Sequence, residues 1–494
     1  MTGTPEPASE ASRDPHDAST RVLRNAAWLA GGGFLAAPLA LLVSAIAAHV
    51  LGPTDFAWIY LATTFAAFGF LVVEWGQSAA LTSTISRDRG RALDWLASSL
   101  GLRALLLGPV ALALLGLGLG LHYPAVFLAA LGCAVLAATF TTASNACQDL
   151  FRGHERADLG AASYLAGQVL AVLLVAPALL LGAGLFGYLL AQVAAAALGA
   201  LALLWFAGRL GAGRLAPDRA RMGQLFLAGR PFLIFNVVLA LQGNLDALFL
   251  SRLAPAEVVG WSAVATKLAG VLVFPATAVI GSLYPTLCRI GPDDPEQSAR
   301  AVRAALRLVL VCAAPLALGC ALFPGLGVRI YGGAAFRPAE SNLHILAAFV
   351  FLVYVTMPLG STLVALGRQR AWTWAQLGCV LVSVVLDPVL IPWFQARTGN
   401  GGLGVCVAGV VAETLMLAAA IRLMPLRLLD GGLRRTAVRV GLAACALLLV
   451  ARTTDGFNPW LAAALSGAGY LAVLLASGEL PWPRLPGLPG ARRR

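Results

Sequence analysis

The sequence predicts an all-α protein that crosses a membrane about fourteen times. Of its 494 residues, 59% are hydrophobic and only 12% are charged. Soluble domains do not have this composition. The apolar residues also gather into runs long enough for transmembrane helices, which need about 20 apolar residues each. The connections between the runs are short, so they leave no room for a large domain outside the membrane.

The apolar runs define the predicted helices in order along the chain. Residues 1–20 are polar, and we expect a disordered tail rather than a signal peptide there, because the first apolar run is long enough to span. Prolines and glycines within the runs are compatible with transmembrane helices. The predicted helices cover residues 24–50, 56–81, 98–121, 125–150, 160–181, 184–207, 225–251, 258–285, 304–326, 342–366, 372–393, 402–424, 436–452 and 459–477.

The arginines predict the orientation of these helices. If the connections are assigned alternately to two sides, 29 of the 35 basic residues fall on the side of the N-terminus and five on the other. The remaining one, Lys267, lies within a predicted helix and is the single lysine of the chain. Cytoplasmic connections carry the excess of basic residues in membrane proteins. We therefore expect a multi-pass protein of a bacterial cytoplasmic (inner) membrane with both termini in the cytoplasm.

Several classes of function are disfavoured by the same sequence. The net charge of +12 could indicate nucleic acid, but the arginines lie between apolar runs and form no basic cluster with interleaved aromatic residues. The eight cysteines are scattered and match neither a disulfide framework nor a metal site. No P-loop or Ser/His/Asp pattern is present. We expect no nucleic-acid partner, no metal, no cofactor and no enzymatic activity.

Two halves of the chain resemble each other, which predicts an internal repeat. Four short matches occur in the same order, and the offset between them grows steadily from 202 to 217 residues. A repeat unit of six helices is even, so both copies have the same orientation and are related by an axis along the membrane normal. The matches pair residues 51–55 with 253–257, Pro109 with Pro315, 153–156 with 367–370, and 184–187 with 401–404.

The repeat predicts two pseudo-symmetric six-helix lobes and two extra C-terminal helices. Two such lobes with a cavity between them are the architecture of an alternating-access transporter. The predicted parts are a tail (1–20), an N-lobe (21–208), a cytoplasmic linker (209–224), a C-lobe (225–426), the two extra helices (427–480) and a C-terminal cytoplasmic tail (481–494).

Two charged residues lie in the predicted helical hairpin 229–289. At 1.5 Å per residue, Asp246 lies about 7–8 Å below the turn and Lys267 about 13–14 Å below it. Charged side chains within a membrane are costly, and a long lysine stem can reach back toward the turn. We expect Asp246 and Lys267 to form a charge pair that faces protein or water. The alternative is a clamp within the hairpin that has no role in transport.

Further polar residues lie within the predicted helices of both halves. Glu74 and Arg103 have similar depths, so we expect them to pair, either as a structural contact or at a binding site, with Asn145 near the cytoplasmic mouth. Glu413 lies mid-helix and is a candidate proton or cation site, and Asp387 is a second candidate unless it is simply solvated. Cations suit a phosphate ligand. The candidate binding residues are Arg103, Lys267, Arg230, Glu74, Asp246, Asn145 and Asn244, although Arg230 could instead snorkel to the surface.

Several short motifs resemble those of polysaccharide transporters of the MOP exporter superfamily. They are Asn244–Leu250, Ala256–Trp261 and Ala265–Leu268 around the hairpin, Leu51–Phe56 after the first helix, Glu74–Gly76 in the second, and Tyr284–Leu287. The resemblance covers roughly residues 20–430 and rests on the order and spacing of the motifs. Glu74 replaces a more common Asp, and Trp261 replaces a Tyr.

This resemblance implies a flippase that moves undecaprenyl-diphosphate-linked oligosaccharide across the cytoplasmic membrane for O-antigen, capsule or exopolysaccharide synthesis. The implied partners are the lipid-linked oligosaccharide and membrane lipids, with polysaccharide polymerase and chain-length proteins as further candidates. Alternatives within the superfamily are a lipid II flippase and a cation-coupled multidrug exporter, although the first helix lacks the carboxylate those exporters often use. A membrane polysaccharide polymerase is a less favoured alternative from another class.

Overall fold

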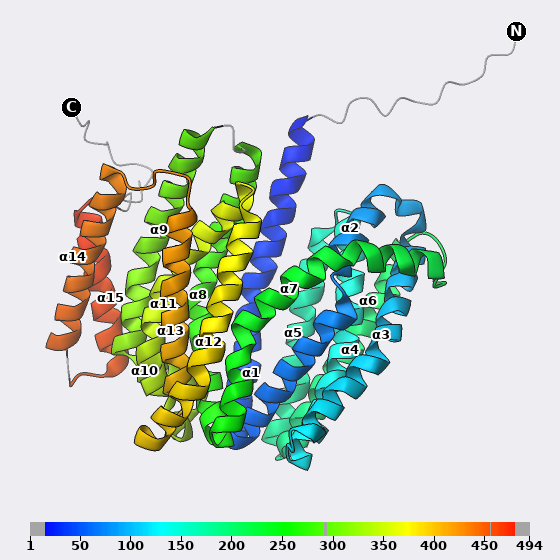
Figure 1. Ribbon diagram of the computed structural model, residues 1–494, viewed down its shortest axis with the longest axis horizontal. Coiled ribbons are helices and arrows are strands. Elements are labelled where there is room, and N and C mark those ends of the chain that lie inside the picture. Colours follow the sequence, from blue (N-terminus) through cyan, green and yellow to red (C-terminus); the bar gives the residue numbers. More distant parts are fainter. Residues whose placement is uncertain (1–14, 291–293, 455, 480–494) are drawn as a thin grey trace, which may run out of the picture. The chain divides into compact units, whose positions relative to one another are not determined.

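All regular structure in the described part of the chain is helical (Figure 1). The computed structural model describes residues 15–290, 294–454 and 456–479. The long helices are α1 (Pro15–Glu74), α3 (Ala92–Gly120), α4 (Ala125–Gly153), α5 (Ala157–Leu180), α6 (Gly184–Leu210), α7 (Arg219–Leu253), α8 (Ala256–Ile290), α9 (Pro295–Leu322), α11 (Ala339–Ala365), α12 (Gln369–Thr398), α13 (Gly402–Leu423), α14 (Gly431–Thr453) and α15 (Pro459–Ala476). The short ones are α2 (Gln77–Arg87) and α10 (Pro324–Tyr331).

The all-α membrane architecture is confirmed, with a helix count close to the expected fourteen. Within the described residues, twelve helices are long and apolar enough to cross a membrane. One of them, α1, contains the first two predicted segments. Its Gly52 has φ 78° and ψ 178°, so the backbone leaves the helical conformation at the predicted turn. The other predicted segment is α7, a helix of 35 residues.

The second predicted segment, residues 56–81, is not one continuous helix. Helix α1 ends at Glu74, and α2 begins at Gln77. Between them, Trp75 and Gly76 both have positive φ, 50° and 65°. Two left-handed residues in succession end the helix, because this conformation is unfavourable for L-residues and cannot continue a right-handed helix. The broken helix matters for the site, since Glu74 is its last residue.

The chain divides into two compact units, which are described separately. Unit 1 comprises residues 1–50 and 62–237, and unit 2 comprises residues 51–61 and 238–494. The expected linker 209–224 groups with unit 1, together with the first half of α7, while the short stretch 51–61 of α1 groups with unit 2. Both α1 and α7 therefore contribute residues to both units.

The two units share a packing pattern that follows the predicted repeat. In unit 1, α4 packs against α3 and α6, and α5 packs against α6. In unit 2, α11 packs against α9 and α13, and α12 packs against α13. The motif pairs fall at corresponding places: α6 begins at Gly184 and α13 at Gly402, while Pro109 and Pro315 lie inside α3 and α9.

The last two helices form a hairpin on unit 2. Helices α14 and α15 lie side by side and both contact α9 (Figure 1). Their shared core includes Ala443, Leu447 and Leu474, which are buried. The Tyr470 hydroxyl donates to the Val311 carbonyl of α9 at 2.8 Å. The hairpin is thus fixed to the unit both by apolar packing and by a hydrogen bond.

The expected tails fall largely outside the described residues. Residues 1–14 of the expected N-terminal tail and residues 481–494 of the expected C-terminal tail are not described, whereas residues 15–20 already belong to α1.

Candidate functional site

Unit 1 brings together three of the expected site residues, Glu74, Arg103 and Asn145. Glu74 closes α1, Arg103 extends from α3, and Asn145 lies on α4. Glu74 Oε1 accepts a hydrogen bond from Asn145 Nδ2 at 2.9 Å. The same oxygen accepts one from the Thr142 hydroxyl at 3.2 Å. The carboxylate at the end of the broken helix is therefore held by two donors from a single neighbouring helix.

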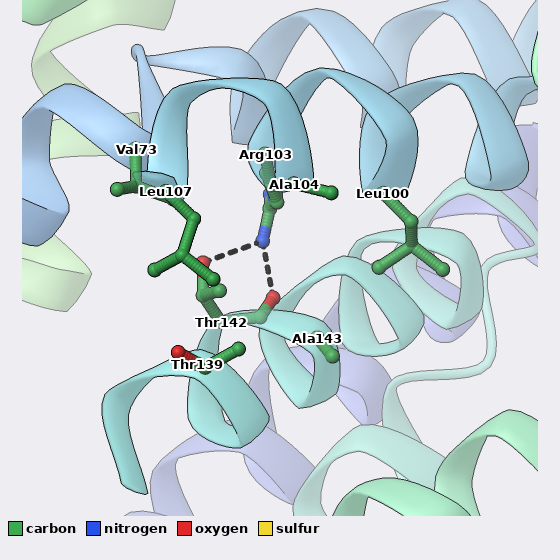
Figure 2. Close-up of a pocket in the computed structure, with 8 residues that line it drawn as sticks. All are labelled: Val73, Leu100, Arg103, Ala104, Leu107, Thr139, Thr142 and Ala143. Atoms are coloured by element: carbon green, nitrogen blue, oxygen red, sulfur yellow. Dashed lines mark hydrogen bonds between the residues drawn. The ribbon is translucent and has the colours of Figure 1, made fainter. Parts of the chain in front are cut away.

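Thr142 connects Glu74 to Arg103. Arg103 Nη1 donates to Thr142 Oγ1 at 3.0 Å and also to the Thr142 carbonyl, so the guanidinium reaches from α3 onto α4 (Figure 2). The expected partners Glu74 and Arg103 are thus connected by the Thr142 hydroxyl, which accepts from the guanidinium and donates to the carboxylate. Thr142 was not predicted from the sequence, because threonine is an ordinary residue in a transmembrane helix.

A second carboxylate, that of Asp149, completes the network. The Asp149 side chain is 0% exposed, and its Oδ2 lies 3.8 Å from Arg103 Nη2. Its Oδ1 accepts from the Ser78 hydroxyl of α2 at 2.6 Å and from Arg152 Nη1 at 2.9 Å. Asp149 was missing from the candidate site residues, although its spacing from Asn145 and Thr142 on α4 places all three on one face.

This face of α4 spans the break between α1 and α2. Thr142 and Asn145 bind the last residue before the break, and Asp149 binds Ser78 just after it. Gln77, also after the break, accepts from the Ser99 hydroxyl of α3 at 2.9 Å. Polar residues of neighbouring helices satisfy the backbone and side chains freed by a broken transmembrane helix. The charges and the break therefore form one structural unit.

A cavity of about 160 Å³ lies beside Arg103. It is bounded by α3, α4 and the end of α1, and its walls are mainly apolar (Figure 2). Arg103 itself is only 3% exposed, and its Nε has no hydrogen-bond partner among the described residues. Because a buried charge without a partner is strongly destabilising, the contacts to Thr142 and Asp149 are what make this position tolerable. The cavity is lined by Val73, Leu100, Arg103, Ala104, Leu107, Thr139, Thr142 and Ala143.

Unit 2 contains a pair of carboxyl groups, Asp246 of α7 and Asp387 of α12. They lie within hydrogen-bonding reach of each other. Among the described residues, both oxygens of Asp387 are otherwise without a donor. Ionised carboxylates only accept hydrogen bonds, so a proton on one of the two groups would let them share a hydrogen bond. Asp387 is buried rather than solvated, and the Tyr60 side chain interacts electrostatically with Asp246.

Asp246 therefore has a different partner from the one that its depth predicted. The expected partner was Lys267, but the carboxyl group of Asp387 lies against Asp246 instead. The Lys267 Nζ lies 5.6 Å from the centroid of the Phe56 ring. Phe56 in turn makes edge contacts with Tyr331 and Phe336 at centroid distances of 6.2 and 5.9 Å. An ammonium near an aromatic face is stabilised by the ring quadrupole.

Three other expected residues lie in separate surroundings. Glu413 on α13 is buried near the side chain of Thr356 on α11, whose hydroxyl donates to the Leu352 carbonyl of its own helix at 3.0 Å. Asn244 donates to the Ala240 carbonyl of its own helix at 3.1 Å. Arg230 is exposed, and its Cζ lies 5.2 Å from the Phe226 ring centroid. These residues belong to neither the Arg103 network nor the Asp246–Asp387 pair.

Within the described residues, no group of three or more His, Cys, Asp or Glu side chains could hold a metal ion. The two sites instead offer a cation between two carboxylates in unit 1 and a carboxyl pair in unit 2. Such groups are suited to proton binding and to polar recognition.

Comparison with known proteins places these features in context. A sequence model of the family described as polysaccharide biosynthesis protein matches residues 22–290. None of the curated proteins compared with the chain matches it.

Several solved structures share the fold at low sequence identity. A lipid II flippase MurJ in an inward closed conformation has a TM-score of 0.73 and 12% identity, covering 91% of this chain and 98% of its own. An inward-facing multidrug resistance MATE family transporter of the MOP superfamily has a TM-score of 0.60 and 17% identity, covering 81% and 96%. A mutant of the Vibrio cholerae MATE transporter VcmN has a TM-score of 0.54 and 16% identity, covering 82% and 96%.

Proposed function

Because the chain belongs to the polysaccharide biosynthesis protein family, we propose that it is a flippase for lipid-linked oligosaccharides. In this proposal it moves undecaprenyl-diphosphate-linked oligosaccharide across the bacterial cytoplasmic membrane by alternating access, for O-antigen, capsule or exopolysaccharide synthesis. Both termini lie in the cytoplasm. The fold shared with a lipid II flippase and with MATE transporters supports transport rather than enzymatic chemistry. Polymerase and chain-length proteins are candidate partners.

The observation that carries the proposal is a buried polar site in each of the two units. Charged side chains in membrane-spanning helices are costly and mark substrate or ion pathways. Unit 1 holds Arg103 between Glu74 and Asp149, and unit 2 holds Asp246 against Asp387.

The roles in this proposal follow from exposure. Lys267 of unit 2 and Arg230 of unit 1 are each candidate contacts for the diphosphate, because both are at least partly exposed, whereas Arg103 is enclosed. Arg103 acts through its charge by holding Glu74 in position, and Glu74 and Asn145 of unit 1 and Asn244 of unit 2 are candidate polar contacts for the sugars. An arginine or lysine is the ordinary partner of phosphate oxygens.

The carboxyl pair is the coupling site in this proposal. A proton shared by Asp246 and Asp387 is a transport ion that the membrane gradient can supply and remove. Glu413 is a second candidate, because it is also buried in unit 2. Substitution of Asp387 by Asn keeps the shape of the side chain and removes the exchangeable proton.

The test is a flipping assay in vesicles that contain purified protein and a lipid-linked oligosaccharide. We expect Lys267→Ala to lower the initial rate at least tenfold, and Lys267→Arg to retain most of it. Arg452→Ala, an exposed arginine outside the proposed site, is the matched control and leaves the rate unchanged. Asp387→Asn abolishes the dependence on the proton gradient. Full activity of both Lys267→Ala and Asp387→Asn at equal protein levels would refute the site.

A lipid II flippase is the second candidate function. It is favoured by the fold shared with a lipid II flippase over 91% of this chain. The same vesicles loaded with lipid II, with an oligosaccharide on undecaprenyl diphosphate, or with a cationic drug distinguish the candidates. Export of the drug alone would assign the chain to multidrug transport instead.

A further inference from the structure

We propose that Asp149 is a proton-binding site, separate from the carboxyl pair of unit 2, that controls the break between α1 and α2. The proposal does not depend on the substrate that is transported. It rests on the partners of Asp149, on its unsatisfied oxygen and on the way in which one face of α4 connects both sides of the break.

The first observation is the unsatisfied oxygen of Asp149. The side chain is 0% exposed, and its Oδ2 has no hydrogen-bond donor among the described residues. The nearest cation, Arg103 Nη2, lies 3.8 Å away, which is too long for a hydrogen bond. A buried carboxylate oxygen without a donor is an unfavourable arrangement. A proton on Oδ2 removes the charge and converts this oxygen into a donor.

The second observation is the local charge. Glu74 and Asp149 are two carboxylates beside one buried cation, Arg103, and the second cation that binds Asp149 lies at a more exposed position. Arg152 also binds Asp149 and is 46% exposed. In the proposal, a proton reaches Asp149 from the side of Arg152 without crossing the apolar cavity wall.

The charged and titratable groups around Asp149 favour a proton over a metal ion. They come from α1, α2, α3 and α4, and at the start of α5 Arg156 pairs with Asp158 instead. A metal ion beside Asp149 would lie next to two guanidinium groups, which repel it. The groups that face Asp149 are Glu74, the Ser78 hydroxyl, Arg103, Cys147 and Arg152.

Protonation changes the connection between α4 and the broken helix. In the ionised form, Asp149 Oδ1 accepts from Ser78, which fixes α2, and from Arg152. In the neutral form, Asp149 no longer balances Arg103, whose charge is then opposed only by Glu74 through Thr142. The contact after the break weakens, and the contact before the break remains. Trp75 and Gly76, the two left-handed residues, lie between these contacts and absorb the change.

The first measurement is infrared difference spectroscopy of the full-length protein in lipid, titrated with acid in the absence of substrate. We expect the wild type to show a carboxylic acid band that forms as the pH falls. Asp149→Asn lacks one component of this band. Asp158→Asn, an exposed carboxylate of the same unit that pairs with Arg156, is the matched control and retains that component. An unchanged band in Asp149→Asn overturns the proposal.

The second measurement is hydrogen–deuterium exchange of residues 75–82, corrected for the intrinsic effect of pH. In the wild type, exchange in this segment rises at acid pH, while α5 does not change. Asp149→Asn exchanges at the acid level at every pH. Ser78→Ala keeps the carboxylate but removes its donor, so it raises exchange at both pH values.

Two outcomes would contradict the assignment even if Asp149→Asn failed to fold. Wild-type exchange in residues 75–82 that is independent of pH refutes a proton-controlled break. Replacement of choline chloride by sodium chloride at constant pH should leave the infrared band and the exchange unchanged. A sodium effect equal to that of acid would instead identify a metal-cation site and overturn the proton assignment.

Discussion

Gly76 gives the sharpest test of the broken helix. It has φ 65°, and it lies directly against α7. A Cβ at this position would lie 2.5 Å from the Gly229 carbonyl oxygen and 2.7 Å from the Phe232 Cβ. Both neighbours are fixed, one as backbone and the other at the root of its side chain. The substitution Gly76→Ala therefore introduces a conformational penalty and a steric one.

The magnitude follows from these two contributions. A non-glycine residue in the left-handed region costs about 1–2 kcal/mol. An added methyl group in a packed site that cannot relax costs about 1–3 kcal/mol. We expect Gly76→Ala to lower the free energy of unfolding by about 2–5 kcal/mol. Gly76→Asn suffers the same steric conflict but a smaller conformational penalty, since Asn tolerates the left-handed region better than Ala.

Gly199 supplies the matched control, because it lies inside α6 and a Cβ there would meet nothing within 4 Å. Gly199→Ala should leave stability unchanged or raise it by up to about 1 kcal/mol. The assay is equilibrium unfolding in mixed micelles, followed by the loss of helical circular dichroism. If Gly76→Ala proves as stable as Gly199→Ala, neither the left-handed turn nor its close contact with α7 exists.

Three further predictions concern stability, two measured by the same unfolding assay and one by the melting temperature. Phe56→Ala removes a buried ring from the aromatic cluster beside Lys267 and should cost about 3–5 kcal/mol; a loss below about 1 kcal/mol would show that the cluster is not packed. Tyr354→Phe removes the 2.7 Å bond to the Leu272 carbonyl and should cost about 0.5–1.5 kcal/mol, and a neutral result would contradict that bond. The pKa of Asp430 lies below its usual value, because the backbone N–H of Leu433 in α14 donates to its carboxylate. The stabilisation of the folded state by ionised Asp430 is therefore present at neutral pH and is lost as the pH falls through the lowered pKa. The melting temperature of Asp430→Ala should thus be lower than that of wild type at neutral pH and approach it in strong acid, and an equal difference at both pH values would disprove the cap.

The positions of the spanning helices were predictable because they depend on local composition. An apolar run long enough to cross the membrane must become a helix, whatever its neighbours are. The break after Glu74 was not predictable in this way, because the apolar run continues through it. Gly76 was the single local signal, and an isolated glycine is tolerated in many transmembrane helices. The contact with Gly229 that requires this glycine is tertiary.

The candidate site was predictable as a set of residues but not as a set of contacts. Similar depths along their helices predicted that Glu74 and Arg103 would lie close together, and the structure connects them through Thr142. Depth failed for Asp246, since levels within one hairpin carry no information on a carboxyl group 141 residues away. Asp387 could be identified as costly to bury, but its partner depended on the packing of α12 within unit 2.

Two helices, α1 and α7, connect the carboxyl pair of unit 2 with the broken helix of unit 1 along the chain. Helix α1 carries Tyr60, which interacts with Asp246 in unit 2, and ends at Glu74 in unit 1. These residues are 14 positions apart, which is about 21 Å of helix. Helix α7 connects the same two places in the opposite chain direction. Its Phe226 stacks on Trp75 at the break, and its second half carries Asp246. Both α1 and α7 therefore run from the break to residues that interact with or carry Asp246.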